Sequence, residues 1–286
     1  MRMLRLVLLT FCAAALGLVA AAMLLPQAEW PGRDVAQGQD MPFPLMPAPA
    51  AGQTGQSGSF AMVTRRSLRG PTPAQFQYSV PDGLSAVTTQ HNTRGRRWHS
   101  LIRPGTLPAP VVILLHGAGR KGLSMIDMWQ DVARQNGIVL IAPDSQAKSW
   151  DVSDLTQSVL EDMLTTVSAT RPIDRNQIYL FGHSDGAIYA AYLINRRLGP
   201  WRAAALHAGF GPAEGYLPAQ TAKPIRLYLG DRDHIFVMSK AEAAAKALAR
   251  AGHAITIQRI PDHTHWFYAA GPKIARDAWQ WFTSLN

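Results

Sequence analysis

From residue 111 onward, short apolar runs alternate with longer amphipathic segments, and this alternation restricts the fold more than any other feature of the chain. The run VVILL at 111–115 is continuously apolar, which is typical of a strand buried on both faces of a sheet. The predicted strands are 111–115, 138–142, 177–181, 203–207, 225–229 and 255–260. The predicted helices are 123–135, 152–169, 185–197, 238–251 and 272–284. This order predicts an α/β fold, with a mostly parallel central sheet and helices on both faces.

Two short antiparallel strands, 86–90 and 97–103, are expected ahead of this region. No insertion of about fifty residues or more separates the predicted strands, so we expect no large cap domain. Residues 76–286 are therefore predicted to form one α/β domain.

The first 25 residues are of a different kind. Arg2 and Arg5 precede an uncharged apolar run at 6–25, which is typical of a signal peptide or an uncut signal anchor. This predicts export to the periplasm or the extracellular space, with a membrane tether through residues 6–25 if the leader is not cleaved. The one cysteine, Cys12, lies inside the run, so the mature domain is expected to contain no disulfide.

Residues 26–75 are rich in Pro, Gly, Gln, Ala and Ser and show neither a helical nor a strand period. This composition predicts a low-complexity linker. A less favoured alternative is that residues 60–63 dock on the domain as a short strand or helix.

The chain is basic, with a formal net charge of +9. Its Lys and Arg residues are scattered, and the group Arg94, Arg96 and Arg97 lacks interleaved aromatic residues. We therefore predict no nucleic-acid partner.

The pentapeptide Gly182-His183-Ser184-Asp185-Gly186 lies between an apolar strand and a predicted helix. This context is that of a nucleophile elbow, in which a sharp turn exposes the central hydroxyl and glycines on either side allow close chain passage. Ser184 is the predicted nucleophile.

A serine nucleophile needs donors for an oxyanion, and the segment His116-Gly117-Ala118-Gly119 directly follows the strand 111–115. We predict backbone N–H groups of Ala118 and Asp185 as the oxyanion donors. The other interpretation of this segment is an ordinary glycine-rich turn.

An orienting acid and a base are expected in the two loops that follow the last strands. After 225–229 the sequence offers Asp231 and Asp233, and we favour Asp233, with Asp231 capping the turn or pairing with Arg232. After 255–260 it offers His263 and His265, and we favour His265, with His263 at the rim of the site.

The remaining histidines have no predicted chemistry. His183 is assigned to packing or to the mouth of the site, and His116, His207 and His234 to structural roles. No H-x-x-x-H or C-x-x-C spacing occurs, so we predict neither a metal nor a cofactor.

The order Ser184, Asp233, His265 is that of α/β hydrolases. With VVILLHGAG, APDSQAKSWD, FGHSDGAIYAA, LYLGDRDHIF and PDHTHW, residues 95–286 resemble small α/β hydrolases related to polyhydroxybutyrate depolymerase, feruloyl and acetylxylan esterases and esterase D. The resemblance implies Ser184, Asp233 and His265 as the triad, and a segment like PDSQAKSWD as one wall of the substrate cleft.

The expected activity is hydrolysis of small or polymeric carboxylic esters through an acyl-enzyme. Two alternatives stay open: a peptidase or amidase using the same triad, and a binding protein that keeps the fold without catalysis. Trp150, Trp266 and Phe267 are candidates for either the substrate pocket or the core.

Overall fold

The computed structural model describes residues 58–71, 75–219 and 221–285. The predicted leader and most of the predicted linker lie outside these ranges. Within them, no helix combines the length and the apolar character needed to cross a bilayer.

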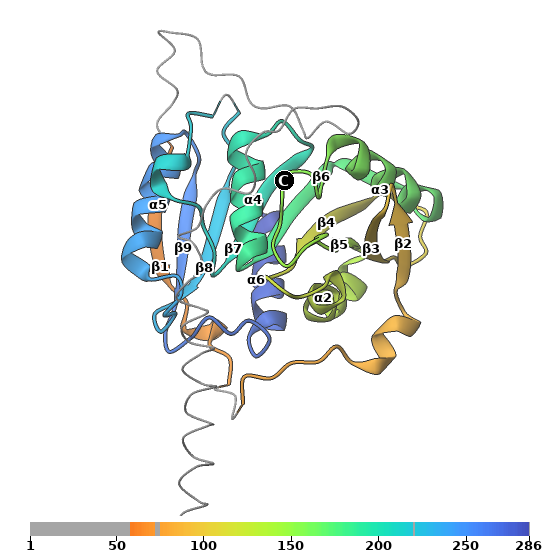
Figure 1. Ribbon diagram of the computed structural model, residues 1–286, viewed down its shortest axis with the longest axis horizontal. Coiled ribbons are helices and arrows are strands. Elements are labelled where there is room, and N and C mark those ends of the chain that lie inside the picture. The colour runs from red at the N-terminus through yellow and green to blue at the C-terminus, as the bar shows by residue number, and fades with distance from the viewer. Residues whose placement is uncertain (1–57, 72–74, 220, 286) are drawn as a thin grey trace, which may run out of the picture.

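A single nine-stranded sheet forms the centre of the described part of the chain, in the order β1-β9-β8-β7-β6-β4-β5-β3-β2 (Figure 1). Strand β3 pairs antiparallel with β2 and β5, and the other neighbouring strands are parallel. The strands are β1 Phe60–Thr64, β2 Thr89–Thr93, β3 Arg96–Leu101, β4 Ala109–Leu115, β5 Val139–Pro143, β6 Ile173–His183, β7 Trp201–His207, β8 Ile225–Gly230 and β9 Ile255–Ile260. The predicted α/β architecture is confirmed.

Helices cover both faces of this sheet, so the molecule has three layers. They are α2 Gly122–Asn136, α3 Gln157–Thr170, α4 Asp185–Arg196, α5 Met238–Arg250 and α6 Gly271–Thr283. Helices α3, α4 and α5 pack on the face to which Ile113 of β4 points, whereas α2 and α6 pack on the face of Leu114. Because successive side chains of a strand point to opposite faces, the continuous apolar run of β4 serves both cores.

The predicted linker, residues 26–75, extends too far toward the C-terminus. Strand β1 lies inside it and pairs in parallel with β9, with Phe60 opposite Ile255. An unpaired β9 would expose a row of backbone donors and acceptors at the edge of the sheet, and FAMVT has the β-branched and aromatic residues that suit a strand. The less favoured alternative, in which residues 60–63 dock on the domain as a strand, is therefore confirmed.

Arg65 ties the end of β1 to the domain. Its guanidinium donates to Gln258 Oε1 at 3.3 Å and to the buried carboxylate of Asp277 on α6. Asp277 also accepts bonds from Arg226 Nη1, at 3.0 Å, and from Tyr228 Oη, at 2.7 Å. The carboxylate therefore joins β1, β8 and α6.

Replacing Arg65 with alanine is expected to lower the free energy of unfolding by about 1–2 kcal/mol, because hydrogen bonds to a charged partner are lost at a partly exposed site. The matched control is Arg66→Ala, since Arg66 is exposed at the neighbouring position and should change stability by less than about 0.5 kcal/mol. Urea unfolding measures both. Equal destabilisation by the two variants would contradict the anchoring role of Arg65.

The predicted strand 86–90 starts too early: Asp82–Ala86 is a 3-10 helix, and β2 begins at Thr89. The register of the β2–β3 hairpin is set by its turn, in which Arg94 and Gly95 both have positive φ angles, 50° and 78°. A two-residue turn with positive φ at both positions matches the right-handed twist of the two strands that it joins. It places Thr93 opposite Arg96.

Candidate active site

Ser184 occupies the bend between β6 and α4, with φ 55° and ψ −119°. This left-handed conformation is rare for a residue with a side chain and indicates stored backbone strain. A Cβ atom on Gly182 would lie 2.2 Å from the Gly186 carbonyl oxygen, and one on Gly186 would lie 2.2 Å from that of Leu115. The two flanking glycines are therefore required for the chain to pass, as the motif predicts.

The predicted triad residues lie in one line of hydrogen bonds. His265 Nε2 lies 2.9 Å from Ser184 Oγ, and His265 Nδ1 lies 2.9 Å from Asp233 Oδ2. The other carboxylate oxygen of Asp233 accepts the N–H groups of Ile235 and Phe236, each at 2.9 Å. Since a carboxylate only accepts, Nδ1 carries the imidazole proton and Nε2 is free to accept the serine hydroxyl.

Asp231, the alternative acid, lies away from the imidazole. Its carboxylate accepts the N–H of Asp262 at 2.7 Å and pairs with Arg259 at 3.3 Å. Its predicted pairing with Arg232 is wrong, because Arg232 contacts Asp262 instead, at 2.8 Å.

His263, the alternative base, is not at the rim as predicted. It is buried, and its Nε2 lies 2.9 Å from Nε2 of His207. The backbone turns at Asp262, where φ is 57°, and after this turn His263 lies in the interior whereas His265 reaches Ser184.

Of the two predicted oxyanion donors, Asp185 directly follows Ser184, and Ala118 lies in a loop beside it. Asp185 is the first residue of α4, a position where the helix supplies no acceptor for the N–H. Ala118 lies in the loop after β4, and among the described residues its N–H has no acceptor. That loop lies against the nucleophile, because a Cβ on the neighbouring Gly117 would be 3.4 Å from Ser184 Cβ.

Apolar and aromatic side chains flank the imidazole. Phe236 stacks on His265 with ring centroids 5.7 Å apart, next to the partly exposed Ile235 and Val237. Trp266 follows His265 in the chain, and its ring centroid lies 5.8 Å from that of Phe76 and 5.3 Å from that of Tyr268. Phe236 therefore presents an apolar ring beside the imidazole of the triad.

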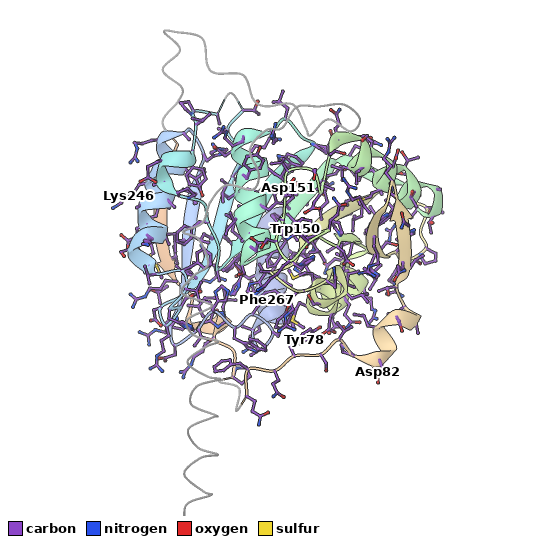
Figure 2. All side chains as sticks on the ribbon, viewed as in Figure 1. Tyr78, Asp82, Trp150, Asp151, Lys246 and Phe267 are labelled. Atoms are coloured by element: carbon purple, nitrogen blue, oxygen red, sulfur yellow. The ribbon has the colours of Figure 1, made fainter. Side chains whose placement is uncertain are left out.

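Of the three aromatic residues that were candidates for the pocket or the core, two belong to the core. Trp150 is buried and stacks on Tyr189, with ring centroids 5.2 Å apart, and Phe267 is fully buried, with its ring centroid 4.9 Å from that of His183. Figure 2 labels Trp150 and Phe267. Of the three candidates, only Trp266 is partly exposed beside the triad.

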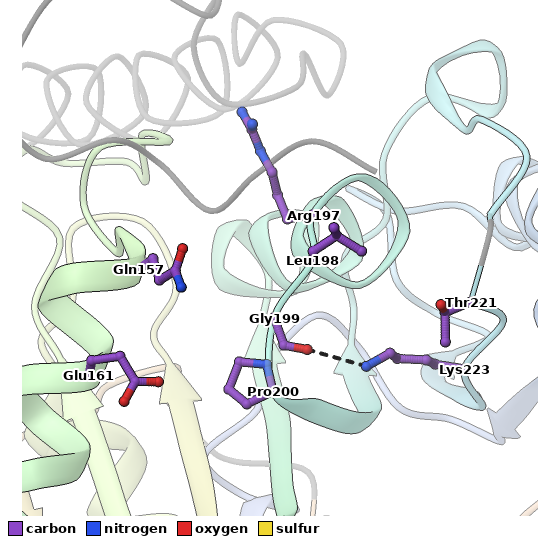
Figure 3. A pocket seen from close by; sticks show the side chains of 8 residues that line it. All are labelled: Gln157, Glu161, Arg197, Leu198, Gly199, Pro200, Thr221 and Lys223. Atoms are coloured by element: carbon purple, nitrogen blue, oxygen red, sulfur yellow. Dashed lines mark hydrogen bonds between the residues drawn. The ribbon is translucent and has the colours of Figure 1, made fainter. Parts of the chain in front are cut away.

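A cavity of about 390 Å³ lies elsewhere, between α3 and the segment that joins α4 to β7 (Figure 3). Its lining includes Glu161, Arg197 and Lys223, and Lys223 Nζ donates to the Gly199 carbonyl at 3.3 Å. No triad residue lines it, so it is separate from the candidate site. The part of the chain that the structure describes has no group of three His, Cys, Asp or Glu residues arranged to hold a metal.

The sequence profile of the dienelactone hydrolase family matches residues 100–285. This chain belongs to that family. A comparison with curated proteins finds no match. The family match confirms the predicted α/β-hydrolase membership. The finer resemblance to polyhydroxybutyrate depolymerase and feruloyl esterase stays a prediction.

Solved structures share the fold of this dienelactone hydrolase family member. A carboxylesterase from Mesorhizobium loti has a TM-score of 0.55 at 16% identity, covering 68% of this chain and 99% of that one. An S-formylglutathione hydrolase from Agrobacterium tumefaciens has a TM-score of 0.55 at 14% identity, covering 69% and 94%. The Bacillus cereus carboxylesterase has a TM-score of 0.52 at 21% identity, covering 65% and 94%. At these identities the likeness establishes the α/β-hydrolase fold.

Sequence reasoning missed a chain of three buried imidazoles in this family member. His183 Nδ1 lies 2.9 Å from His207 Nδ1, and His207 Nε2 lies 2.9 Å from His263 Nε2. Burial lowers the pKa of all three, so each ring is neutral and His207 donates one bond and accepts the other. Their positions in the chain could have indicated this cluster, because His183 and His207 are the last residues of the adjacent strands β6 and β7, and His263 follows β9.

Proposed function

We propose that this domain hydrolyses carboxylic esters through an acyl-enzyme formed on Ser184. The observation that carries the proposal is the unbroken line from Asp233 through His265 to Ser184, with both bonds at 2.9 Å. Membership of the dienelactone hydrolase family supports a hydrolase of this kind.

In the first step, His265 Nε2 removes the Ser184 proton as Oγ attacks the ester carbonyl, and Asp233 stabilises the imidazolium that results. The N–H groups of Ala118 and Asp185 stabilise the oxyanion. His265 then gives the proton to the leaving alcohol, which departs and leaves the acyl group on Ser184. Water then attacks this acyl-enzyme while His265 takes its proton as base. The bond from the acyl carbon to Ser184 Oγ breaks, His265 returns the proton to Oγ, and the carboxylic acid is released.

The test is labelling with a fluorophosphonate together with hydrolysis of p-nitrophenyl butyrate. We expect one label per chain and ester turnover in the parent protein, and neither in Ser184→Ala. Ser85→Ala is the matched control, because Ser85 is an exposed serine in the 3-10 helix Asp82–Ala86. Equal labelling of Ser184→Ala and the parent would contradict the proposal, and an unlabelled parent would favour a binding protein without catalysis.

For the substrate, we propose an ester with an apolar or aromatic acyl group, of the polyhydroxybutyrate or feruloyl type. The partly exposed Ile235, Val237 and Trp266 beside the triad support it. A peptidase or amidase would use the same triad, and comparing matched p-nitrophenyl ester and p-nitroanilide substrates separates the two activities.

We further propose that the protein is exported. The support is the sequence of the leader, in which Arg2 and Arg5 precede the apolar run at 6–25.

A further inference from the structure

The peptide unit between Gly117 and Ala118 has a carbonyl oxygen that is hydrogen-bonded within the described part of the chain and an N–H that is not. Its carbonyl oxygen accepts the N–H of Arg120 at 3.0 Å and lies 2.9 Å from His116 Nδ1. Its N–H is the predicted oxyanion donor of Ala118. In a planar trans peptide the C=O and N–H point in opposite directions, so the groups that hold the Gly117 oxygen also set the direction of the Ala118 N–H.

The hydrogen bonds determine where the His116 proton lies. The backbone N–H of Ser145 donates to His116 Nε2 at 3.0 Å, and a backbone N–H can only donate. Burial of the ring lowers the pKa of His116 to about 4, so the imidazole is neutral at pH 7. With Nε2 accepting, the single proton is on Nδ1, and Nδ1–H donates to the Gly117 oxygen.

The segment 145–150 holds this arrangement from the other side. Trp150 Nε1 donates to the His116 carbonyl at 2.8 Å, and the Gly119 N–H donates to the Lys148 carbonyl at 2.7 Å. The Trp150 and His116 rings also lie 4.8 Å apart. The loop after β4 is thus held by three hydrogen bonds to a segment that comes after β5, two at His116 and one at Gly119.

We propose that His116 is a positioning residue for the oxyanion hole: by donating Nδ1–H to the Gly117 carbonyl, it orients and polarises the peptide whose N–H at Ala118 meets the substrate oxyanion. The proposal rests on the proposed function. A hydrogen bond to a carbonyl strengthens the N–H of the same peptide as a donor, and a donor held in place costs no reorganisation when negative charge develops. The effect should therefore appear in kcat rather than in KM.

Two conservative variants separate the functions of the ring. In His116→Asn, the amide nitrogen takes the place of Nδ1 and can still donate to the Gly117 oxygen, but the acceptor for Ser145 N–H is lost. In His116→Gln, the amide oxygen takes the place of Nε2 and can still accept from Ser145, but the donor to Gly117 is lost. We expect kcat for p-nitrophenyl butyrate to fall about 10- to 100-fold in His116→Gln, with KM changed by less than about threefold. His116→Asn should retain a kcat about tenfold higher than that of His116→Gln.

A trifluoromethyl ketone, which binds serine as an anionic hemiketal, reports on the oxyanion hole directly. Its inhibition constant should rise in His116→Gln by about the same factor by which kcat falls. A folded His116→Gln with a kcat equal to or above that of folded His116→Asn would overturn the proposal. So would an unchanged inhibition constant.

A measurement on the parent protein does not depend on either variant folding. Nitrogen-15 NMR should show the neutral His116 ring protonated at Nδ1, and protonation at Nε2 would overturn the proposal. Failure of the esterase proposal can be told apart from failure of the His116 proposal, because in the first case the parent protein would neither hydrolyse esters nor react with the fluorophosphonate.

Discussion

Replacing His265 with alanine is expected to lower kcat for p-nitrophenyl butyrate by about 10³-fold or more. His265 is the one imidazole within hydrogen-bond distance of Ser184 Oγ among the described residues, at 2.9 Å, and without it the hydroxyl has no base. Removing a triad histidine in other serine hydrolases costs several powers of ten in kcat while substrate binding persists. Steady-state kinetics on the purified variant measures the loss.

His263→Gln is the matched control, because the two histidines are separated by one residue. His263 contacts His207 rather than Ser184, and glutamine keeps a polar group near its Nε2 position. We expect kcat to stay within about tenfold of the parent value. If His263→Gln lost as much activity as His265→Ala, the assignment of the base would be wrong.

Lowering the pH from 7.5 to 4 is expected to destabilise the fold by several kcal/mol. Burial lowers the pKa of seven histidines, and they are His91, His99, His116, His183, His207, His253 and His263. In the unfolded chain these rings take up protons near pH 6.5, whereas in the folded chain they resist protonation. The stability that they contribute is therefore complete above pH 6.5 and is lost progressively as the pH falls toward 4.

The size of this loss of stability can be judged from His116 and His263. Burial lowers the pKa of His116 and of His263 to about 4, and each shift corresponds to about 3 kcal/mol near that pH. Two buried carboxyl groups, Asp154 and Asp185, have raised pKa values and act in the opposite sense. Since a domain is typically stable by about 5–15 kcal/mol, a loss of this size is a large part of the total.

Thermal unfolding at pH 7.5, 6, 5 and 4 measures this effect, with the melting temperature expected to fall most between pH 6 and 4. Return to pH 7.5 before heating is the control that separates protonation from irreversible damage. A melting temperature that stays constant down to pH 4 would show that these histidines are not held neutral in the fold.

Much of the sheet follows from local sequence. Strands β4 and β5, and residues 178–181 of β6, are apolar on both faces because helices cover both sides, and such runs are recognisable without knowledge of their partners. The glycines around Ser184 are likewise local signals, because steric exclusion at a sharp turn involves residues close in sequence. These features could be predicted with their chain order.

Strand β1 could not be predicted in the same way. It is five residues long, with four of them exposed, and its pairing depends on β9, which lies about 200 residues later in the chain. The imidazole chain was missed for a related reason. His207 and His263 are ordinary residues in sequence, and only the folding of β7 beside β6 and the turn at Asp262 brings them to His183.

The pairing of β1 with β9 sets a lower limit on how far the protein can be shortened. A recombinant protein that started at residue 76, where the low-complexity composition ends, would lack β1 and the Arg65 anchor. Its β9 would then be an open edge of parallel sheet, available to a strand from another molecule. Truncation at that point would thus favour aggregation even though every residue of the triad is retained.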